Sequence, residues 1–124
     1  MPLTGGTFTG AVTGTTLADS KGDVRSVPSN TQSSAYTIVA ADAGKTIVIS
    51  SGGVTVPASG MSAGDVVTII NNSTSDQTIT LAVGVTLFNT GDGTNANRTL
   101  AGRGMATIWF ADASTAYISG AGLS

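Results

Sequence analysis

Side chains that could perform acid–base or nucleophilic chemistry are scarce in this sequence. The chain has 124 residues and contains neither histidine nor cysteine. All seven acidic residues are aspartates, and they lie singly along the chain: Asp19, Asp23, Asp42, Asp65, Asp76, Asp92 and Asp112. General acid–base catalysis usually depends on His or on a carboxylate with a shifted pKa, and a serine nucleophile needs a neighbouring base. We therefore predict that the protein is not an enzyme.

Residues 43–46, AGKT, resemble the end of a phosphate-binding P-loop. That motif requires a glycine five residues before Gly44, where this sequence has Val39, and it requires a helix afterwards. The β-branched run TIVIS follows instead. We interpret AGKT as a turn that leads into a strand.

Oxygen-bearing side chains gather in residues 89–98, NTGDGTNANR. Asp92, Asn89, Asn95 and Asn97 are of the types that bind calcium. The stretch has one carboxylate, however, and its spacing is neither that of an EF-hand nor that of a calcium-binding nonapeptide repeat. We interpret it as an Asx-rich hairpin loop, and we expect the protein to need no metal and no other cofactor.

Trp109 and Tyr117 are the aromatic residues whose types suit binding. In one interpretation they stack against the sugar ring of a glycan, since an aromatic side chain presents a flat apolar face. In the other, which we favour, they pack in the core or between subunits.

Composition narrows the classes of partner. Charged residues make up 10% of the chain and the net charge is −2, against about 25% charged residues in ordinary globular proteins. The five Lys and Arg are scattered, so we expect no nucleic-acid partner. No apolar run approaches the length of a membrane span, and we expect no membrane partner. Threonine occurs 20 times, and a surface so poor in charge suits a protein largely covered by neighbouring subunits.

The elements that would position these side chains are short β-strands. Apolar and β-branched runs alternate with segments rich in Gly, Asn, Asp and Ser, which are turn compositions. We expect strands near residues 36–39, 46–50, 54–56, 66–71, 78–82, 85–88, 105–111 and 116–119. A single helical turn is expected near residues 40–44, where Asp42 could cap it. Strands at this spacing predict an all-β fold, either a small sandwich of jelly-roll type or a barrel.

Alternation with a period of two supports half-buried strands. Ile47 and Ile49 share one face of their strand, as do Ile79 and Leu81, and Ile108 and Phe110. The runs VVTII and MATIWF also carry apolar residues on the opposite face. Because these apolar residues would otherwise face solvent, we expect another sheet or another subunit to pack against that second face.

The amino-acid composition of the chain changes near Ser33. Residues 1–32 are rich in Thr, Gly and Ser with isolated apolar residues, and the regular β-type pattern lies beyond them. We expect residues 1–32 to form an extended N-terminal arm and residues 33–124 to form the β-domain.

Two parts of the chain resemble structural proteins of tailed bacteriophages. The opening PLTGGTFTG is similar to the Leu-Thr-Gly-Gly-Thr-x-Thr-Gly element that recurs in trimeric, β-structured tail fibres. The rest resembles a small β-domain found at the C-termini of phage virion proteins, through YTIVAADAG, VTVP, AGD, NN, RTL and ISGAGL. Neither resemblance brings a catalytic residue with it.

The resemblance implies a homotrimer located in the virion, with the major capsid protein or a tail protein as its partner. A fibre has repeated shaft segments, whereas the leader occurs here once, and we expect no large anchoring module before it. These features favour a capsid decoration, or cement, protein. The alternative is a tail fibre or its receptor-binding tip, and a host-surface glycan is a partner only under that alternative.

The arm is the expected attachment segment. Its glycines would let backbone approach backbone, and its spaced apolar residues would anchor it to a partner as it orders. The residues assigned to this contact are Leu3, Gly5, Gly6, Phe8, Gly10, Val12 and Leu17. The competing interpretation is a flexible leader without a binding role.

Overall fold

A computed structural model describes residues 6–7, 9–11, 13–15, 17–24 and 26–124 of the chain. Within this part the chain forms strands and one turn of 3-10 helix, η1 (Ala40–Asp42). The strands are β1 (Ala18–Asp19), β2 (Gly22–Asp23), β3 (Ser29–Gln32), β4 (Tyr36–Thr37), β5 (Thr46–Ile49), β6 (Val54–Val56), β7 (Val66–Asn71), β8 (Gln77–Leu81), β9 (Thr86–Asn89), β10 (Arg98–Phe110) and β11 (Thr115–Leu123).

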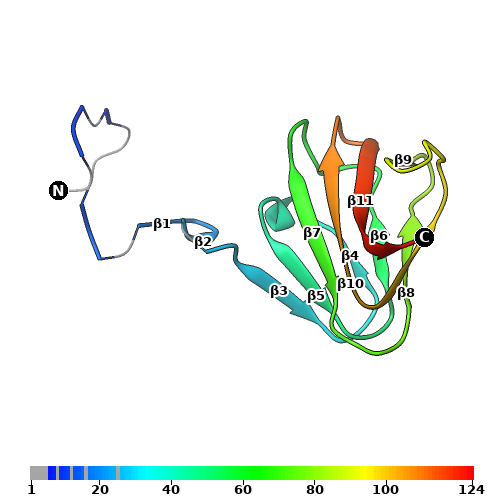
Figure 1. The fold of residues 1–124 in the computed structure, drawn as a ribbon. Coiled ribbons are helices and arrows are strands. Elements are labelled where there is room, and N and C mark those ends of the chain that lie inside the picture. Colours follow the sequence, from blue (N-terminus) through cyan, green and yellow to red (C-terminus); the bar gives the residue numbers. More distant parts are fainter. Residues whose placement is uncertain (1–5, 8, 12, 16, 25) are drawn as a thin grey trace.

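From β3 to β8 the chain winds alternately between two faces (Figure 1). Strands β3, β5 and β7 lie side by side in parallel on the first face, with Ser29 opposite Thr46 and Thr46 opposite Thr68. Strands β4, β6 and β8 form an equally parallel second face. Each coil therefore lies on the one before it, as in a short two-sided β-solenoid.

The long strand β10 closes this stack. Its beginning, Arg98–Leu100, pairs antiparallel with β8 on the second face, and Met105–Trp109 pairs antiparallel with β7 on the first. Between the two parts the strand bends at Arg103, whose φ of 65° lies in the left-handed region. Strand β11 then pairs antiparallel with β10 and parallel with β9, so the sheet closes almost into a barrel.

The core lies between the two faces. Inward side chains of both faces and of the closing strands form one cluster, in which the largest fully buried members are Phe110, Ile38, Ile47, Ile49, Ile69, Ile79, Leu87, Leu100, Ile108 and Ile118. The predicted alternation is thus seen directly. Leu81, predicted on the same face as Ile79, is only partly buried.

Successive coils approach closely at the corner between β5 and β6. Gly53 has a φ of 72°, and a Cβ atom there would lie 2.4 Å from the carbonyl oxygen of Thr78. Its carbonyl accepts the N–H of Tyr36 at 3.1 Å, and its own N–H is bound by the side chain of Gln77. Only glycine fits this position, because it needs both a left-handed backbone and no side chain.

The all-β prediction is confirmed, in its barrel-like form. The strand pairing is not that of a jelly roll, since both faces of the solenoid are parallel. The expected helical turn is present as η1. Asp42 stands at the end of this turn rather than at its start, and its carboxylate accepts the N–H of Val39 at 2.9 Å.

The main sheet begins earlier than the sequence pattern suggested. Strand β3 (Ser29–Gln32) lies within the expected arm, yet it pairs in parallel with β5 along its whole length. Before it, β1 and β2 form a separate two-stranded hairpin. The β-domain of the folded chain therefore starts at Ser29.

Candidate functional site

Three aromatic side chains form a row on the outside of the domain. Trp109 of β10 is opposite Tyr117 of β11, and Tyr117 is opposite Phe88 of β9. The ring centroids of Trp109 and Tyr117 are 5.9 Å apart, and those of Tyr117 and Phe88 are 5.2 Å apart with an edge-to-face tilt of 65°. Trp109 is 46% exposed and Tyr117 37%. We call these three residues the aromatic row.

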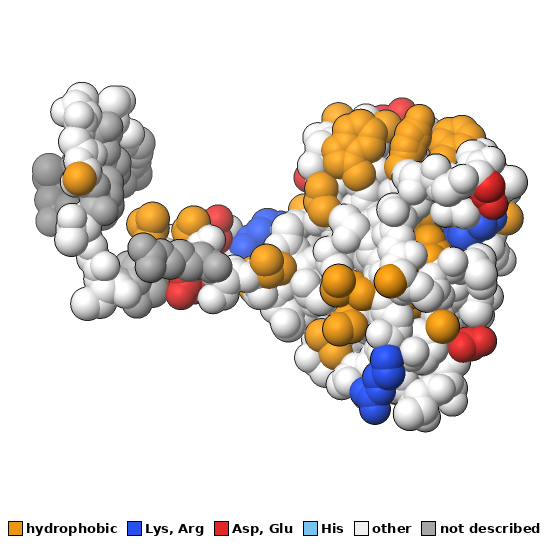
Figure 2. All heavy atoms as spheres, in the orientation of Figure 1, with side chains coloured by type: hydrophobic (Ala, Val, Ile, Leu, Met, Phe, Trp, Pro, Cys, Tyr) orange, Lys and Arg blue, Asp and Glu red, His pale blue; other side chains and the backbone are white. Residues whose placement is uncertain are grey.

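Strand alternation explains why the row faces outward. Ile108 and Phe110 flank Trp109, Ile118 follows Tyr117, and Leu87 precedes Phe88, and all four are buried. Because successive side chains of a strand point to opposite sides, burying these neighbours directs the rings toward solvent. Figure 2 shows hydrophobic side chains gathered at the upper end of the domain, over the ends of β9, β10 and β11.

Beyond the aromatic row, the outer face of β7 and β10 carries the second apolar face that the sequence predicted. Val66 of β7 lies opposite Trp109 and is 37% exposed. Farther along β10, the hydroxyl groups of Thr107 and Thr68 are 3.3 Å apart. Next comes Met105, which is 51% exposed. Within the described chain no second sheet covers this face, so Trp109 and Tyr117 are not core residues.

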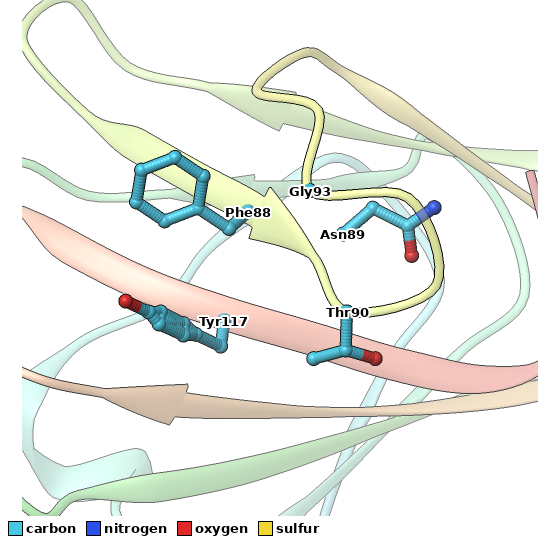
Figure 3. A pocket seen from close by; sticks show the side chains of 5 residues that line it. All are labelled: Phe88, Asn89, Thr90, Gly93 and Tyr117. Atoms are coloured by element: carbon cyan, nitrogen blue, oxygen red, sulfur yellow. The ribbon is translucent and has the colours of Figure 1, made fainter.

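A shallow hollow opens at the end of the aromatic row. It is lined by Phe88, Asn89, Thr90, Gly93 and Tyr117 and has a volume of about 370 Å³. Figure 3 shows the rings of Phe88 and Tyr117 on one side and the side chains of Asn89 and Thr90 on the other. The hollow thus combines apolar faces with a polar edge.

The side chains of the Asx-rich loop are largely used to hold the loop itself. Asn95 accepts the N–H of Leu87 through its side-chain oxygen, and Asn97 accepts that of Leu81, both at 2.9 Å. The side chain and N–H of Thr94 both donate to Asp92, and these bonds lower the pKa of that carboxyl group. The described residues contain no group of three or more acidic side chains that could hold a metal ion.

A buried polar cluster lies at the start of the solenoid. The carboxylate of Asp42 is 1% exposed and accepts hydrogen bonds from Asn30 at 2.9 Å and from the hydroxyl of Tyr36 at 2.7 Å. Burial, together with the bond to Asp42 and its charge, raises the pKa of Tyr36. Neither group faces the hollow, and we regard the cluster as structural.

The AGKT segment forms a turn, as the sequence suggested. Gly44 has a φ of 79°, and β5 begins two residues later, at Thr46. No helix follows, so a phosphate would not find the helix N-terminus that a P-loop provides.

The described part of the arm extends away from the β-domain (Figure 1). At its base, Lys21 donates through Nζ to the carbonyl oxygens of Ala41 and Ala43. Leu17 is 58% exposed. A Cβ atom added at Gly6 or Gly10 would meet no atom within 4 Å, so the described structure leaves open space for a side chain at both positions.

Of the residues assigned to partner binding by the arm, Leu3, Gly5, Phe8 and Val12 lie outside the described residues. The structure adds two exposed apolar side chains at the base of the arm, Val24 and Val27. It also adds Phe88 to the predicted pair Trp109 and Tyr117. Phe88 was not identified because the parallel pairing of β9 with β11 has no local sequence pattern.

No protein-family model matches the sequence, and no curated protein matches it. Among the described residues, no helix has the length and apolar character needed to cross a membrane.

Proposed function

We propose that this protein is a non-enzymatic structural component of a tailed-phage virion, a trimeric capsid decoration protein held to the capsid through its N-terminal arm. The observation that carries the proposal is the separation of the chain into two parts. The β-domain buries its own core, whereas the described residues of the arm leave that domain with their apolar side chains exposed. An extended segment of this kind gains contacts and main-chain hydrogen bonds when it orders on a partner.

The base of the arm suits such an attachment. Leu17, Val24 and Val27 are 58%, 58% and 65% exposed. The hydrogen bonds from Lys21 to Ala41 and Ala43 hold the base of the arm against the domain. A partner that binds the arm would therefore also position the β-domain. This arrangement, with the LTGGTFTG element, supports decoration of a larger assembly.

The second candidate function is a tail fibre or receptor-binding tip, and the exposed aromatic row is the observation that favours it. A cement protein needs its surface mainly for the capsid, whereas a receptor-binding tip needs an exposed surface for the host. The two functions place the protein at different ends of the virion.

Deletion of the gene distinguishes the two. For a decoration protein, we expect virions without it to lose DNA more readily on heating or osmotic shock, while adsorption to cells stays normal. DNA release and adsorption would be measured on the same preparations, with complemented virions as the control. Robust heads combined with failed adsorption would contradict the decoration function.

A further inference from the structure

We propose that the hollow beside the aromatic row is a binding site for a neutral saccharide, with the ring of Tyr117 as its stacking surface. This site is independent of the arm, and it goes beyond attachment to a capsid. A sugar ring has an apolar face of C–H groups and a rim of hydroxyl groups, and the hollow offers a partner for each.

Aromatic residues are concentrated here to a degree that packing does not require. The chain has six aromatic side chains. Phe110 belongs to the core, the hydroxyl of Tyr36 donates a hydrogen bond to Asp42, and Phe8 lies outside the described residues. The other three form the aromatic row. Exposing a tryptophan and a tyrosine side by side forgoes apolar burial at two positions.

The polar edge supplies hydrogen-bonding groups at the same place. Asn89 and Thr90 line the hollow together with Phe88 and Tyr117. The hydroxyl of Thr90 makes no hydrogen bond within the described chain, nor does that of Tyr117. Binding sites for small ligands commonly combine a mostly apolar lining with a few placed polar groups of this kind.

The edge is also rigid. The backbone N–H of Thr90 donates to the carbonyl of Ile118 at 3.0 Å, which ties the end of β9 to β11. The N–H of Gly93 donates to the carbonyl of Asn89 at 2.7 Å and closes the turn. A preorganised site loses less entropy on binding.

Charge points to the class of ligand. None of the five residues that line the hollow is charged, and the neighbouring outward side chains Trp109, Thr107 and Val66 are uncharged too. An anionic or cationic ligand would find no opposite charge in the lining. A neutral saccharide matches both the uncharged lining and the mixture of ring faces and hydroxyl groups.

Trp109 makes the test direct, because it is the only tryptophan of the chain and stands next to Tyr117. The full chain would be titrated with methyl glycosides of glucose, galactose, mannose and N-acetylglucosamine, and with their short oligosaccharides, while tryptophan emission is followed. We expect at least one of these to change the emission saturably. Y117L, which keeps an apolar strand residue, should weaken that binding by about tenfold or more.

Two matched variants locate the site. T90V removes the hydroxyl at constant shape and should weaken binding several-fold. M105A removes an exposed apolar side chain from the same strand as Trp109, away from the hollow, and should leave binding unchanged. Thermal unfolding of each variant would establish that it is folded; if Y117L does not fold, T90V and M105A still decide the outcome.

Three results would overturn the proposal. One is an emission that none of the saccharides changes. Another is binding that M105A weakens as much as T90V does. The third is a sedimenting mass of W109A lower than that of the unmodified protein, found together with a tryptophan emission of the unmodified protein that no saccharide changes. This result would assign the aromatic row to contact with a second copy of the chain. None of these results bears on attachment through the arm.

Discussion

Asn71 holds the corner at which β7 ends and the closing strand bends. Its side chain is completely buried. The amide nitrogen lies 2.8 Å from the carbonyl oxygen of Ser75 and 3.0 Å from those of Leu100 and Ala101. The amide oxygen accepts the N–H and the hydroxyl of Ser73. One side chain thereby connects the last turn of the solenoid to the bend of β10.

Replacement of Asn71 by aspartate should therefore be strongly destabilising. A carboxylate would face three carbonyl oxygens without a donor, and we expect a loss of about 3–5 kcal/mol in unfolding free energy at neutral pH. N71A, which leaves carbonyls unpaired without adding charge, should cost about 1–3 kcal/mol. Urea denaturation would measure both variants. Equal stability of N71D and the unmodified protein would contradict this role of the amide.

The hydrogen bond from Tyr36 to Asp42 predicts that the protein loses stability at alkaline pH. The pKa of Tyr36 is raised in the folded protein, chiefly by burial and then by Asp42. A raised pKa means that folding favours the protonated hydroxyl. This contribution is complete below the unfolded pKa of about 10 and is lost as the pH rises through the folded value.

The measurement is the unfolding free energy across the alkaline range, from about pH 8 to pH 11. We expect a decline at the upper end that is shallower in Y36F, which has no hydroxyl to ionise. Y117F serves as the control, because Tyr117 is on the outer face and does not contact Asp42. An identical alkaline decline in Y36F and the unmodified chain would show that Tyr36 is not its source.

At the scale of elements, β3 divides the N-terminal segment into an arm and a structural strand. Deletion of residues 1–27 keeps β3, whereas deletion of residues 1–32 removes it. The longer deletion exposes the edge of β5. It also removes Asn30, which donates a hydrogen bond to the buried carboxylate of Asp42. We expect the first truncation to unfold near the midpoint of the full chain. The second should lose roughly 1–3 kcal/mol, as a buried acceptor without its partner costs about that much.

Chemical denaturation of the two truncated chains would test this boundary. If both are equally stable, β3 adds nothing to the domain and the structural role assigned to it is wrong.

The arm itself should matter for attachment and not for folding. Under the proposed function, deletion of residues 1–16 should leave thermal unfolding unchanged and weaken binding to virions. F8A removes an apolar side chain worth about 1.5–3 kcal/mol when buried, or about ten- to hundredfold in Kd. T9P should do more harm, because proline cannot donate a main-chain hydrogen bond.

Binding to capsids stripped of the protein would be measured by co-sedimentation, with V83A as the control. Val83 is 99% exposed on a turn of the β-domain and lies outside the arm. Full affinity of the truncated protein would mean that the arm is only a leader.

At the scale of the whole molecule, we predict a trimer in solution. Charged residues form 10% of the chain, and apolar side chains remain exposed on the outer sheet face and at the base of the arm. Burial between subunits would remove part of this apolar surface from water. Sedimentation equilibrium at micromolar concentration should give three times the mass of the chain, and a clean monomer would count against the trimer.

The sequence by itself determined the elements that local chemistry controls. The alternation of TIVIS and of MATIWF identified buried Ile47, Ile49, Ile108 and Phe110, because a period of two assigns each side chain to one face of a strand. Turn residues located the loops, since glycine, asparagine and aspartate favour backbone conformations that end a strand. The alternation also placed Trp109 on the face opposite Ile108 and Phe110, but it did not decide whether that face was covered.

Tertiary structure alone decided which strands are neighbours. Parallel pairing joins residues of different coils, such as Ser29 with Thr46 and Tyr117 with Phe88, and no local periodicity records these partners. The polar strand β3 could not be recognised for the same reason: it is a strand because β5 offers it an edge. The aromatic row, the buried amide of Asn71 and the Tyr36–Asp42 bond likewise exist only where the folded backbone brings distant residues together.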